Sequence, residues 1–130
     1  MIVLDASAAL EVLLNTPVAQ RVGDRLFAAR ETLHAPHLID LEVAQVLRRY
    51  ALRRELAPER GQQALEDFAD LPLTRYPHEL LLSRIWELRH LVTAYDAAYL
   101  ALAEALAAPL VTRDRALARA RGHRATVEVL

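Results

Sequence analysis

The 130-residue sequence contains no cysteine and no lysine. Without cysteine the protein has no thiol nucleophile, disulfide, thiolate zinc site or redox switch. No apolar run approaches the roughly 20 residues that a membrane-spanning helix needs, and the N-terminal MIVLDAS has no basic leader of the kind that opens a signal peptide. We therefore expect a soluble protein that does not bind membranes, and the lack of cysteine is compatible with a cytoplasmic location.

The length and the 54% share of apolar residues suit one domain, residues 1–130, with a sizeable core. Sixteen basic and 17 acidic residues give a net charge of −1, so net charge alone does not argue for a nucleic-acid partner. Every basic residue is an arginine, which suits bidentate phosphate contacts, but a GC-rich genome explains this composition equally well. Many of them fall into two groups, Arg48, Arg49, Arg53 and Arg54, and then Arg113, Arg115, Arg119, Arg121 and Arg124.

Short apolar, β-prone segments alternate along the chain with segments of helical spacing. Strands are predicted at residues 2–4, 33–35, 110–112 and 126–130, and residues 71–74 form a strand or a connector. Helices are predicted to begin at Ser7 and to cover residues 16–30, 38–54, 58–70, 77–90, 94–107 and 115–120. Short strands separated by helices favour an α/β sandwich with a mainly parallel central sheet.

Four acidic residues stand out from their surroundings. Asp5 ends the first predicted strand, and Asp114 follows the strand at residues 110–112 within two residues. In a parallel sheet both lie at the carboxyl ends of strands, where ligands bind. Glu42 and Asp96 lie in apolar stretches near helix starts, and an embedded carboxylate is costly to bury unless it is paired or holds a metal. We expect all four to meet at one edge of the sheet.

Each of these acids also has an ordinary explanation. Asp5 can cap the next helix, Asp96 and Asp114 can stabilise helix starts, and Glu42 can be solvated. Four convergent carboxylates, in contrast, would repel one another, raise some of their pKa values and destabilise the fold unless cations occupy the pocket. Ligation by oxygen alone selects Mg²⁺ or Mn²⁺ rather than zinc.

The acids lie in four segments, residues 2–10 (IVLDASAAL), 35–47 (APHLIDLEVAQVL), 93–104 (TAYDAAYLALAE) and 109–117 (PLVTRDRAL). In their order and spacing these segments resemble the PIN-domain ribonucleases, and most closely the VapC-type toxins of bacterial toxin–antitoxin pairs. Each segment alone is a weak signal, whereas the ordered set is specific and covers essentially the whole chain. The resemblance implies a PIN-like α/β/α sandwich.

The resemblance also implies a Mg²⁺- or Mn²⁺-dependent endoribonuclease. The implied metal-site and catalytic residues are Asp5, Glu42, Asp96 and Asp114, with Ser7 and Thr112 as polar supports. Relatives vary in a further acid or asparagine just after the last segment, and residues 115–117 offer none, which leaves the second of two metal positions in question. Asp40 is a possible substitute ligand, although its place at a helix start suits the helix dipole first.

The implied reaction is an in-line displacement by metal-activated water, with a nearby carboxylate to steer or deprotonate that water. Its products are a 5′-phosphate and a 3′-hydroxyl. The implied partners are an RNA, either transfer or ribosomal, and a small VapB-like antitoxin that blocks the acidic groove, often with an arginine. A homodimer formed through an apolar face is also implied, with the helices between Leu38 and Asp70 as the candidate surface.

Other residues are weaker candidates. The two arginine groups can contact phosphates or simply form solvated helix faces. His37 and His90 can edge the pocket, but five scattered histidines without a metal-type pair favour structural or surface roles. Base stacking is possible for Tyr95, Tyr99 and Trp86, although helical spacing beside leucines favours core packing.

Several other classes fit less well. A receiver-type phosphoacceptor domain needs a lysine, which this chain lacks. A haloacid-dehalogenase-like phosphatase needs a second aspartate two residues after the first, where this chain has Ser7. Neither Ser7 nor Ser83 lies in the G-x-S-x-G pattern of a serine hydrolase. The remaining alternative is a catalytically silent PIN-fold module that acts through a protein partner.

Overall fold

In the computed structural model, which describes all 130 residues, five parallel strands form one central sheet. The strands are β1 (Ile2–Leu4), β2 (Leu33–Pro36), β3 (Leu73–Tyr76), β4 (Leu110–Thr112) and β5 (Val127–Val129). Their order is β3-β2-β1-β4-β5, and the register places Val3 of β1 between His34 of β2 and Leu110 of β4. This sheet confirms the parallel α/β architecture predicted from the sequence.

The order of the strands creates a crevice at the centre of the sheet. From β1 the chain adds β2 and β3 on one side, and it then returns to add β4 and β5 on the other side. The connections that leave the carboxyl ends of β1 and β4 therefore diverge, and in open parallel sheets ligands bind at such a switch point. Asp5 directly follows β1, and Asp114 follows β4 by two residues.

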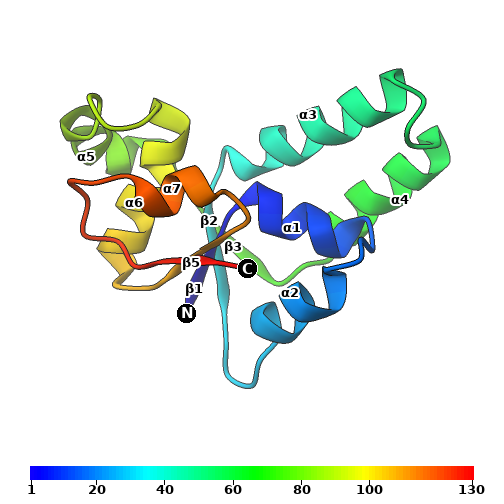
Figure 1. The fold of residues 1–130 in the computed structure, drawn as a ribbon, viewed down its shortest axis with the longest axis horizontal. Coiled ribbons are helices and arrows are strands. Elements are labelled where there is room, and N and C mark those ends of the chain that lie inside the picture. The colour runs from blue at the N-terminus through cyan, green and yellow to red at the C-terminus, as the bar shows by residue number, and fades with distance from the viewer.

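Helices cover both faces of the sheet (Figure 1). On one side lie α1 (Ala6–Leu13) and α2 (Ala19–Leu26), and on the other lie α5 (Leu82–Glu87) and α6 (Ala94–Leu106). The long helix α3 (Ile39–Leu52) and its partner α4 (Pro58–Ala69) project from the sheet as a pair. Two short elements complete the fold, the 3₁₀ helix η1 (His78–Leu81) and α7 (Arg115–Arg119). No helix has both the length and the apolar character that crossing a bilayer requires.

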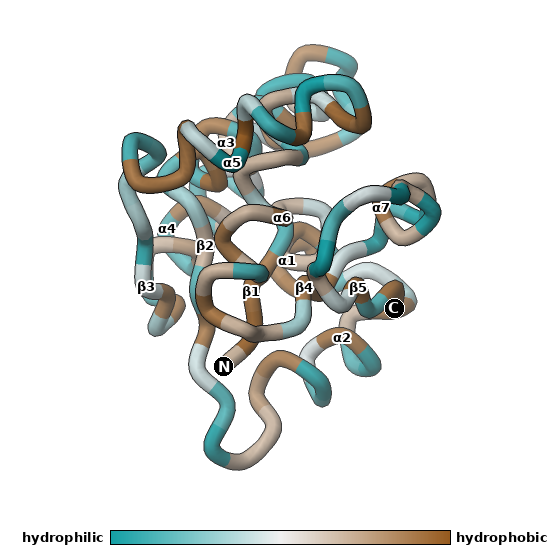
Figure 2. The backbone as a smooth tube through the Cα atoms, turned by 90° about the vertical axis from the view of Figure 1, so that its left-hand side faces the viewer, coloured by the Kyte–Doolittle hydropathy of each residue, from teal (hydrophilic) through white to brown (hydrophobic).

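The core holds the carboxyl ends of β1 and β4 in place. All three residues of β1 are fully buried, and α6 is buried continuously from Ala97 to Ala103. Full burial of a Val, Leu or Ile side chain contributes roughly 1.5–3 kcal/mol, so these elements are rigid supports. In Figure 2 the tube of β1 is brown, the colour of apolar residues, whereas hydrophilic teal recurs along the outer helices and turns.

Two predicted helices are shorter or divided in the structure. The helix expected at residues 16–30 is confined to α2, because the chain turns into β2 with Arg30 at a φ of 69°. The helix expected at 77–90 is divided into η1 and α5. In its first turn, His78 Nε2 accepts a hydrogen bond of 2.8 Å from the Leu38 amide at the start of α3. Helical periodicity contains no information on such a long-range contact.

Candidate active site

A pocket of about 370 Å³ opens at the carboxyl ends of β1 and β4. Five acidic residues line it, Glu11 on α1 and four others, which are Asp5, Glu42, Asp96 and Asp114. These four come from separate places in the chain: the end of β1, the first turn of α3, the first turn of α6 and the start of α7. The structure therefore brings together the four acids that the sequence singles out. Their roles as metal ligands and catalytic groups stay predictions.

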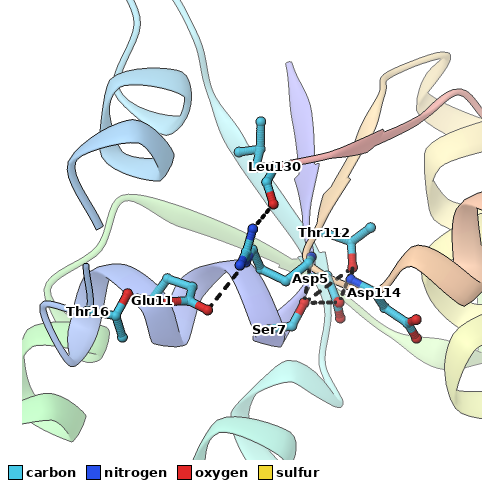
Figure 3. A network of polar contacts seen from close by, with 8 residues as sticks. Asp5, Ser7, Glu11, Thr16, Thr112, Asp114 and Leu130 are labelled. Atoms are coloured by element: carbon cyan, nitrogen blue, oxygen red, sulfur yellow. Dashed lines mark hydrogen bonds and ion pairs between the residues drawn. The ribbon is translucent and has the colours of Figure 1, made fainter. Parts of the chain in front are cut away.

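The Asp5 carboxylate is fixed through one of its two oxygens. Asp5 Oδ2 accepts hydrogen bonds of 2.6 Å from the hydroxyls of both Ser7 and Thr112 (Figure 3). Asp5 occupies the N-cap position of α1, yet its side chain makes no capping hydrogen bond, so the capping explanation fails for this residue. No protein group hydrogen-bonds to Oδ1, which leaves this oxygen available to a ligand in the pocket.

The two hydroxyls also connect Asp5 to the chain after β4. Ser7 Oγ accepts a hydrogen bond of 3.0 Å from the Arg113 amide, and Thr112 Oγ1 accepts one of 2.9 Å from the Asp114 amide. Each of the two hydroxyls thus donates its proton to Asp5 and also accepts one backbone amide proton. Ser7 and Thr112 therefore fix the position of Asp5 and of the segment that contains Asp114. Their role as polar supports of a metal site stays a prediction.

Asp96 and Asp114 are positioned by helix starts. Asp114 is the N-cap of α7, and its Oδ1 accepts a hydrogen bond of 2.8 Å from the Ala116 amide. Asp96 lies in the first turn of α6, where its amide donates to Thr93 Oγ1 at 3.2 Å. The capping explanation thus holds for Asp114, and Thr93 rather than Asp96 caps α6. A helix start favours a nearby negative charge, so both positions suit a carboxylate side chain.

Glu42 is held by a tyrosine from the core. The fully buried Tyr99 donates a hydrogen bond of 2.7 Å from its hydroxyl to Glu42 Oε1. Glu42 is therefore fixed and partly buried rather than freely solvated. Of the aromatic residues considered from the sequence, Tyr99 is a core residue, as favoured there, whereas Tyr95 and Trp86 are exposed by 67% and 68%. Core packing was the wrong expectation for these two, because both side chains face solvent rather than the leucines beside them.

The pocket disfavours negative charge on its own side chains. Burial raises the pKa of Glu42, the hydrogen bond from Tyr99 lowers it, and the charges of Asp5 and Asp96 raise it again, with a net upward shift. Burial raises the pKa of Asp96 as well, and the charges of Asp5 and Asp114 add to this effect. Burial also raises the pKa of the Tyr99 phenol, so the phenol stays protonated and keeps donating to Glu42. A bound cation would relieve this repulsion.

Of the two arginine groups, one residue from each lines the pocket, namely Arg49 and Arg113. Arg113 Nε donates to Glu11 Oε1 at 3.3 Å, and its Nη1 donates to the Leu130 carbonyl (Figure 3). Glu11 was not predicted from the sequence. Its spacing of four residues from Ser7 on α1 places both on one helix face, and this spacing was the available signal.

Three residues considered for the pocket lie outside it. Asp40 is not a substitute ligand, because its carboxylate pairs with Arg75 Nε at 2.7 Å on the surface. His37 and His90 are both exposed and do not line the pocket. The His37 ring instead packs edge-on against His78, with ring centroids 5.9 Å apart. The surface role favoured for the histidines fits these two residues.

The donor set suits a hard divalent cation, although it does not form a closed cage. The four acidic side chains that the sequence singles out present oxygen, which Mg²⁺ and Mn²⁺ prefer. As the side chains stand, no group of three or more acidic or histidine residues has the geometry to hold a metal ion together. Mg²⁺ keeps several of its waters and often needs one or two protein carboxylates plus substrate phosphates. The open arrangement fits that mode of binding.

The fold and this pocket define a parallel α/β protein with an acidic site at the switch point of its sheet, and sequence comparison specifies the family. The PIN domain model matches residues 2–122, so the chain belongs to the PIN domain family. Among its relatives, Ribonuclease VapC9 of Mycobacterium tuberculosis is 51% identical over 114 residues, which cover 88% of this chain and 86% of that protein. Ribonuclease VapC12 of the same organism is 42% identical over 130 residues, which cover 100% and 99%. These relatives confirm the resemblance to VapC ribonucleases.

Solved structures with lower identity confirm the fold. PAE2754 from Pyrobaculum aerophilum superposes with a TM-score of 0.72 at 24% identity, covering 99% of this chain and 83% of that one. VapBC2 from Rickettsia felis, solved bound to a DNA fragment from its promoter, gives a TM-score of 0.67 at 17% identity and covers 99% and 98%. At these identities the likeness concerns the arrangement of the chain.

Proposed function

We propose that this protein is a Mg²⁺- or Mn²⁺-dependent endoribonuclease of the VapC type, which acts as the toxin of a toxin–antitoxin pair. The observation that carries the proposal is the convergence of Asp5, Glu42, Asp96 and Asp114 from four separate chain segments into one pocket at the switch point of the sheet. The relatives named above are ribonucleases, which supports the same activity for this chain.

Asp5, through its free Oδ1, and Glu42, Asp96 and Asp114 are the proposed metal-site residues. A divalent ion bound there supplies charge neutralisation at the scissile phosphate and lowers the pKa of a coordinated water. Ser7 and Thr112 keep the Asp5 carboxylate in one orientation, because both hydroxyls donate to the same oxygen. The Asp5 carboxylate is thus held in place before the RNA substrate binds.

The remaining pocket residues act on the substrate and on water. Arg49 and Arg113 present guanidinium groups that suit the phosphates flanking the cleaved bond. Glu42 is the proposed group that steers or deprotonates the attacking water, because Tyr99 fixes one of its oxygens and its raised pKa brings it closer to the range useful for a base. The expected products are a 5′-phosphate and a 3′-hydroxyl.

An alternative is a catalytically silent module that keeps the fold and acts through a protein partner. The observation that favours it is the lack of a preformed group of three metal ligands. Isothermal titration of Mg²⁺ and Mn²⁺ into the protein separates the two functions, since heat of binding that disappears in an Asp5→Asn variant supports the nuclease and an absence of binding supports the silent module.

We also propose a VapB-like antitoxin as the protein partner. The Rickettsia felis neighbour was solved as a VapBC pair, and the acidic pocket of this chain is a complementary target for an arginine of such a partner. A homodimer and a cytoplasmic location, both expected from the sequence, stay predictions. Size-exclusion chromatography with light scattering tests the dimer directly.

The deciding experiment is cleavage of total RNA by purified protein in Mg²⁺, Mn²⁺ or EDTA. Wild type is compared with Asp5→Asn and Asp96→Asn, and with the matched control Asp24→Asn, which changes an exposed acid on α2 outside the pocket. Metal-dependent cleavage that both pocket variants lose and the control keeps establishes the function. Cleavage that survives both pocket substitutions assigns the activity to another site or to a contaminant. No cleavage by the wild type favours the silent module.

A further inference from the structure

An apolar groove of about 270 Å³ lies beside the acidic pocket along α3. Leu38, Leu41 and Val46 supply its apolar lining, and Gln45 and Arg49 supply polar groups. The spacing of these residues corresponds to one face of α3 and of the residue that precedes it. Leu41 is 76% exposed, so the groove presents an apolar side chain to solvent without a partner in the chain.

Tyr95, at the start of α6, lines the same groove. It directly precedes Asp96 of the acidic pocket, and its phenol makes no hydrogen bond within the protein. Tyr99, one helical turn later, is fully buried and serves Glu42. The two tyrosines of this segment thus have different environments. The exposed ring of Tyr95 does not contribute to the core or to a hydrogen bond within the protein.

The groove and the acidic pocket are continuous. Glu42, Val46 and Arg49 line both of them. A nucleic-acid strand with one phosphate in the acidic pocket can therefore reach this groove with an adjoining nucleotide. Arg49 stands between the two and offers positive charge to the backbone phosphate that links them.

On the basis of the ribonuclease function proposed above, we propose that this groove binds one nucleobase of the RNA next to the scissile phosphate, stacked on Tyr95 and packed against Leu41. Single-stranded RNA is recognised by bases that splay out onto aromatic side chains, and the exposed ring and apolar lining provide such a platform. The Gln45 amide, which has two donors and one acceptor, is placed to contact the edge of the base and to give a sequence preference.

The test combines protein variants with changes in the substrate. The cleavage site of a short RNA is mapped with wild-type protein, and an abasic nucleotide is then placed in turn on either side of the scissile phosphate. Stacking is worth about 1–3 kcal/mol per base, so Tyr95→Ala is expected to lower kcat/KM for intact RNA by roughly 10- to 100-fold. One of the two abasic substrates should lower wild-type kcat/KM by a similar factor and leave Tyr95→Ala indifferent.

Matched variants separate stacking from other effects. Tyr95→Phe keeps the ring and should retain kcat/KM within about twofold, whereas Tyr95→Leu keeps an apolar side chain but should lose most of the effect. Trp86→Ala removes an equally exposed aromatic on α5 that does not line the groove, and it should leave kcat/KM unchanged. Equal losses for Tyr95→Ala on intact RNA and on both abasic RNAs would overturn the proposal.

Two further readouts distinguish this inference from its alternatives. RNA binding in the Asp5→Asn background, followed by fluorescence anisotropy, tests the groove without turnover: weaker binding by Tyr95→Ala supports the inference even if the wild type cleaves no RNA. Unchanged binding and cleavage by Tyr95→Ala, with an active wild type, overturn the inference and leave the ribonuclease function standing. A change from dimer to monomer in Leu41→Ala or Tyr95→Ala by light scattering would instead assign the groove to a second copy of the chain and overturn the proposal.

Discussion

Thr112 and Asp5 are 107 residues apart in the chain, yet the buried Thr112 hydroxyl donates a 2.6 Å hydrogen bond to Asp5 Oδ2. The contact spans β1 and β4, the two strands that flank the switch point of the sheet. It couples the position of the first acid to the strand that leads to the last one. The shape of the acidic pocket therefore depends on a neutral side chain.

A Thr112→Val variant should lose both stability and activity. Valine keeps the volume but removes a hydrogen bond to a charged group, which is worth about 1.5–3 kcal/mol, and it leaves the Asp114 amide without its acceptor. Urea denaturation measures the stability. Misplacement of a catalytic group by about 1 Å costs up to roughly 100-fold, so a fall in kcat of at least about 10-fold is expected on an RNA substrate.

The control for this prediction is Thr126→Val. Thr126 is exposed, and its side chain makes no hydrogen bond, while its carbonyl alone accepts from Leu110. The substitution removes the same hydroxyl from a place where it has no partner and should leave kcat unchanged. Wild-type kcat in a folded Thr112→Val protein would show that the orientation of Asp5 does not depend on this contact.

The sequence was sufficient for β1, β2, β4 and β5 and for the acids that follow β1 and β4, whereas β3 was left open as a strand or a connector. A parallel arrangement of short strands places the residues after β1 and β4 at one edge, so the meeting of Asp5 and Asp114 follows from the fold class. Glu42 and Asp96 were recognisable because a carboxylate in an apolar stretch needs a partner. The partner of Glu42, the Tyr99 hydroxyl, lies 57 residues away and required the structure.

The remaining features depend on long-range contacts or on the direction of a side chain. For Glu11 the spacing from Ser7 was the available signal, and its partner Arg113, which is 102 residues away, required the structure. Tyr95 and Tyr99 have the same residue type and a helical spacing, yet one faces solvent and the other faces the core. Which of two nearby residues on a helix is buried depends on how the helix sits on the sheet, and this orientation is a property of the tertiary structure.

Removal of one charge from the pocket should stabilise the ion-free protein. The folded protein raises the pKa values of Glu42 and Asp96 above their ordinary values. The stability that these two groups contribute is therefore fully present at a pH below their ordinary pKa values, and it is lost as the pH rises through their raised pKa values. Ionisation of these two carboxylates costs stability because both are partly buried and lie near other negative charges. Asp96→Asn is therefore expected to raise the Tm in EDTA by a few degrees at pH 7, and by progressively less as the pH falls toward 4.

Divalent ions should stabilise the wild type more than they stabilise Asp96→Asn. A ligand that binds the folded state stabilises it according to its concentration and affinity, so Mg²⁺ or Mn²⁺ should raise the Tm of the wild type and raise that of Asp96→Asn much less. Asp24→Asn, which changes an exposed acid outside the pocket, should behave as wild type in both measurements. Equal stabilisation of all three proteins by Mg²⁺ would show that the ion binds elsewhere.

A second buried carboxylate should affect stability without affecting cleavage. Glu104, with a side chain 6% exposed, accepts hydrogen bonds of 2.8 and 3.1 Å from Arg84, and one of 2.7 Å from the Arg124 amide. It lies eight residues along α6 from Asp96, or about 12 Å at 1.5 Å per residue. Glu104→Gln should cost about 3 kcal/mol in urea denaturation, because Arg84 loses its principal partner.

The pH dependence of stability provides the check on Glu104. Arg84 lowers the pKa of Glu104 below its ordinary value of 4.5, so the stability from this group is present above pH 4.5 and is lost as the pH falls through the lowered pKa. Glu104→Gln should therefore lose less stability than the wild type over that acid range. Its kcat at a temperature where it is folded should match the wild type, and a large fall in kcat would place Glu104 in the cleavage machinery.

The salt dependence of RNA binding should separate two adjacent arginines of α3. Arg49 lines the acidic pocket, whereas Arg48 is exposed and does not. Each phosphate contact with a single strand contributes about 0.7 to the slope of log Kd against log salt concentration, so Arg49→Gln should reduce this slope by roughly that amount and Arg48→Gln should leave it unchanged. Anisotropy of a labelled RNA in the Asp5→Asn background gives the slope without turnover.

Both substitutions remove one positive charge from the same helix, so their effect on the long-range field of the protein is nearly equal. A difference between them therefore reports direct contact, and equal slopes would mean that arginines attract RNA through the field alone and that Arg49 does not touch the phosphate.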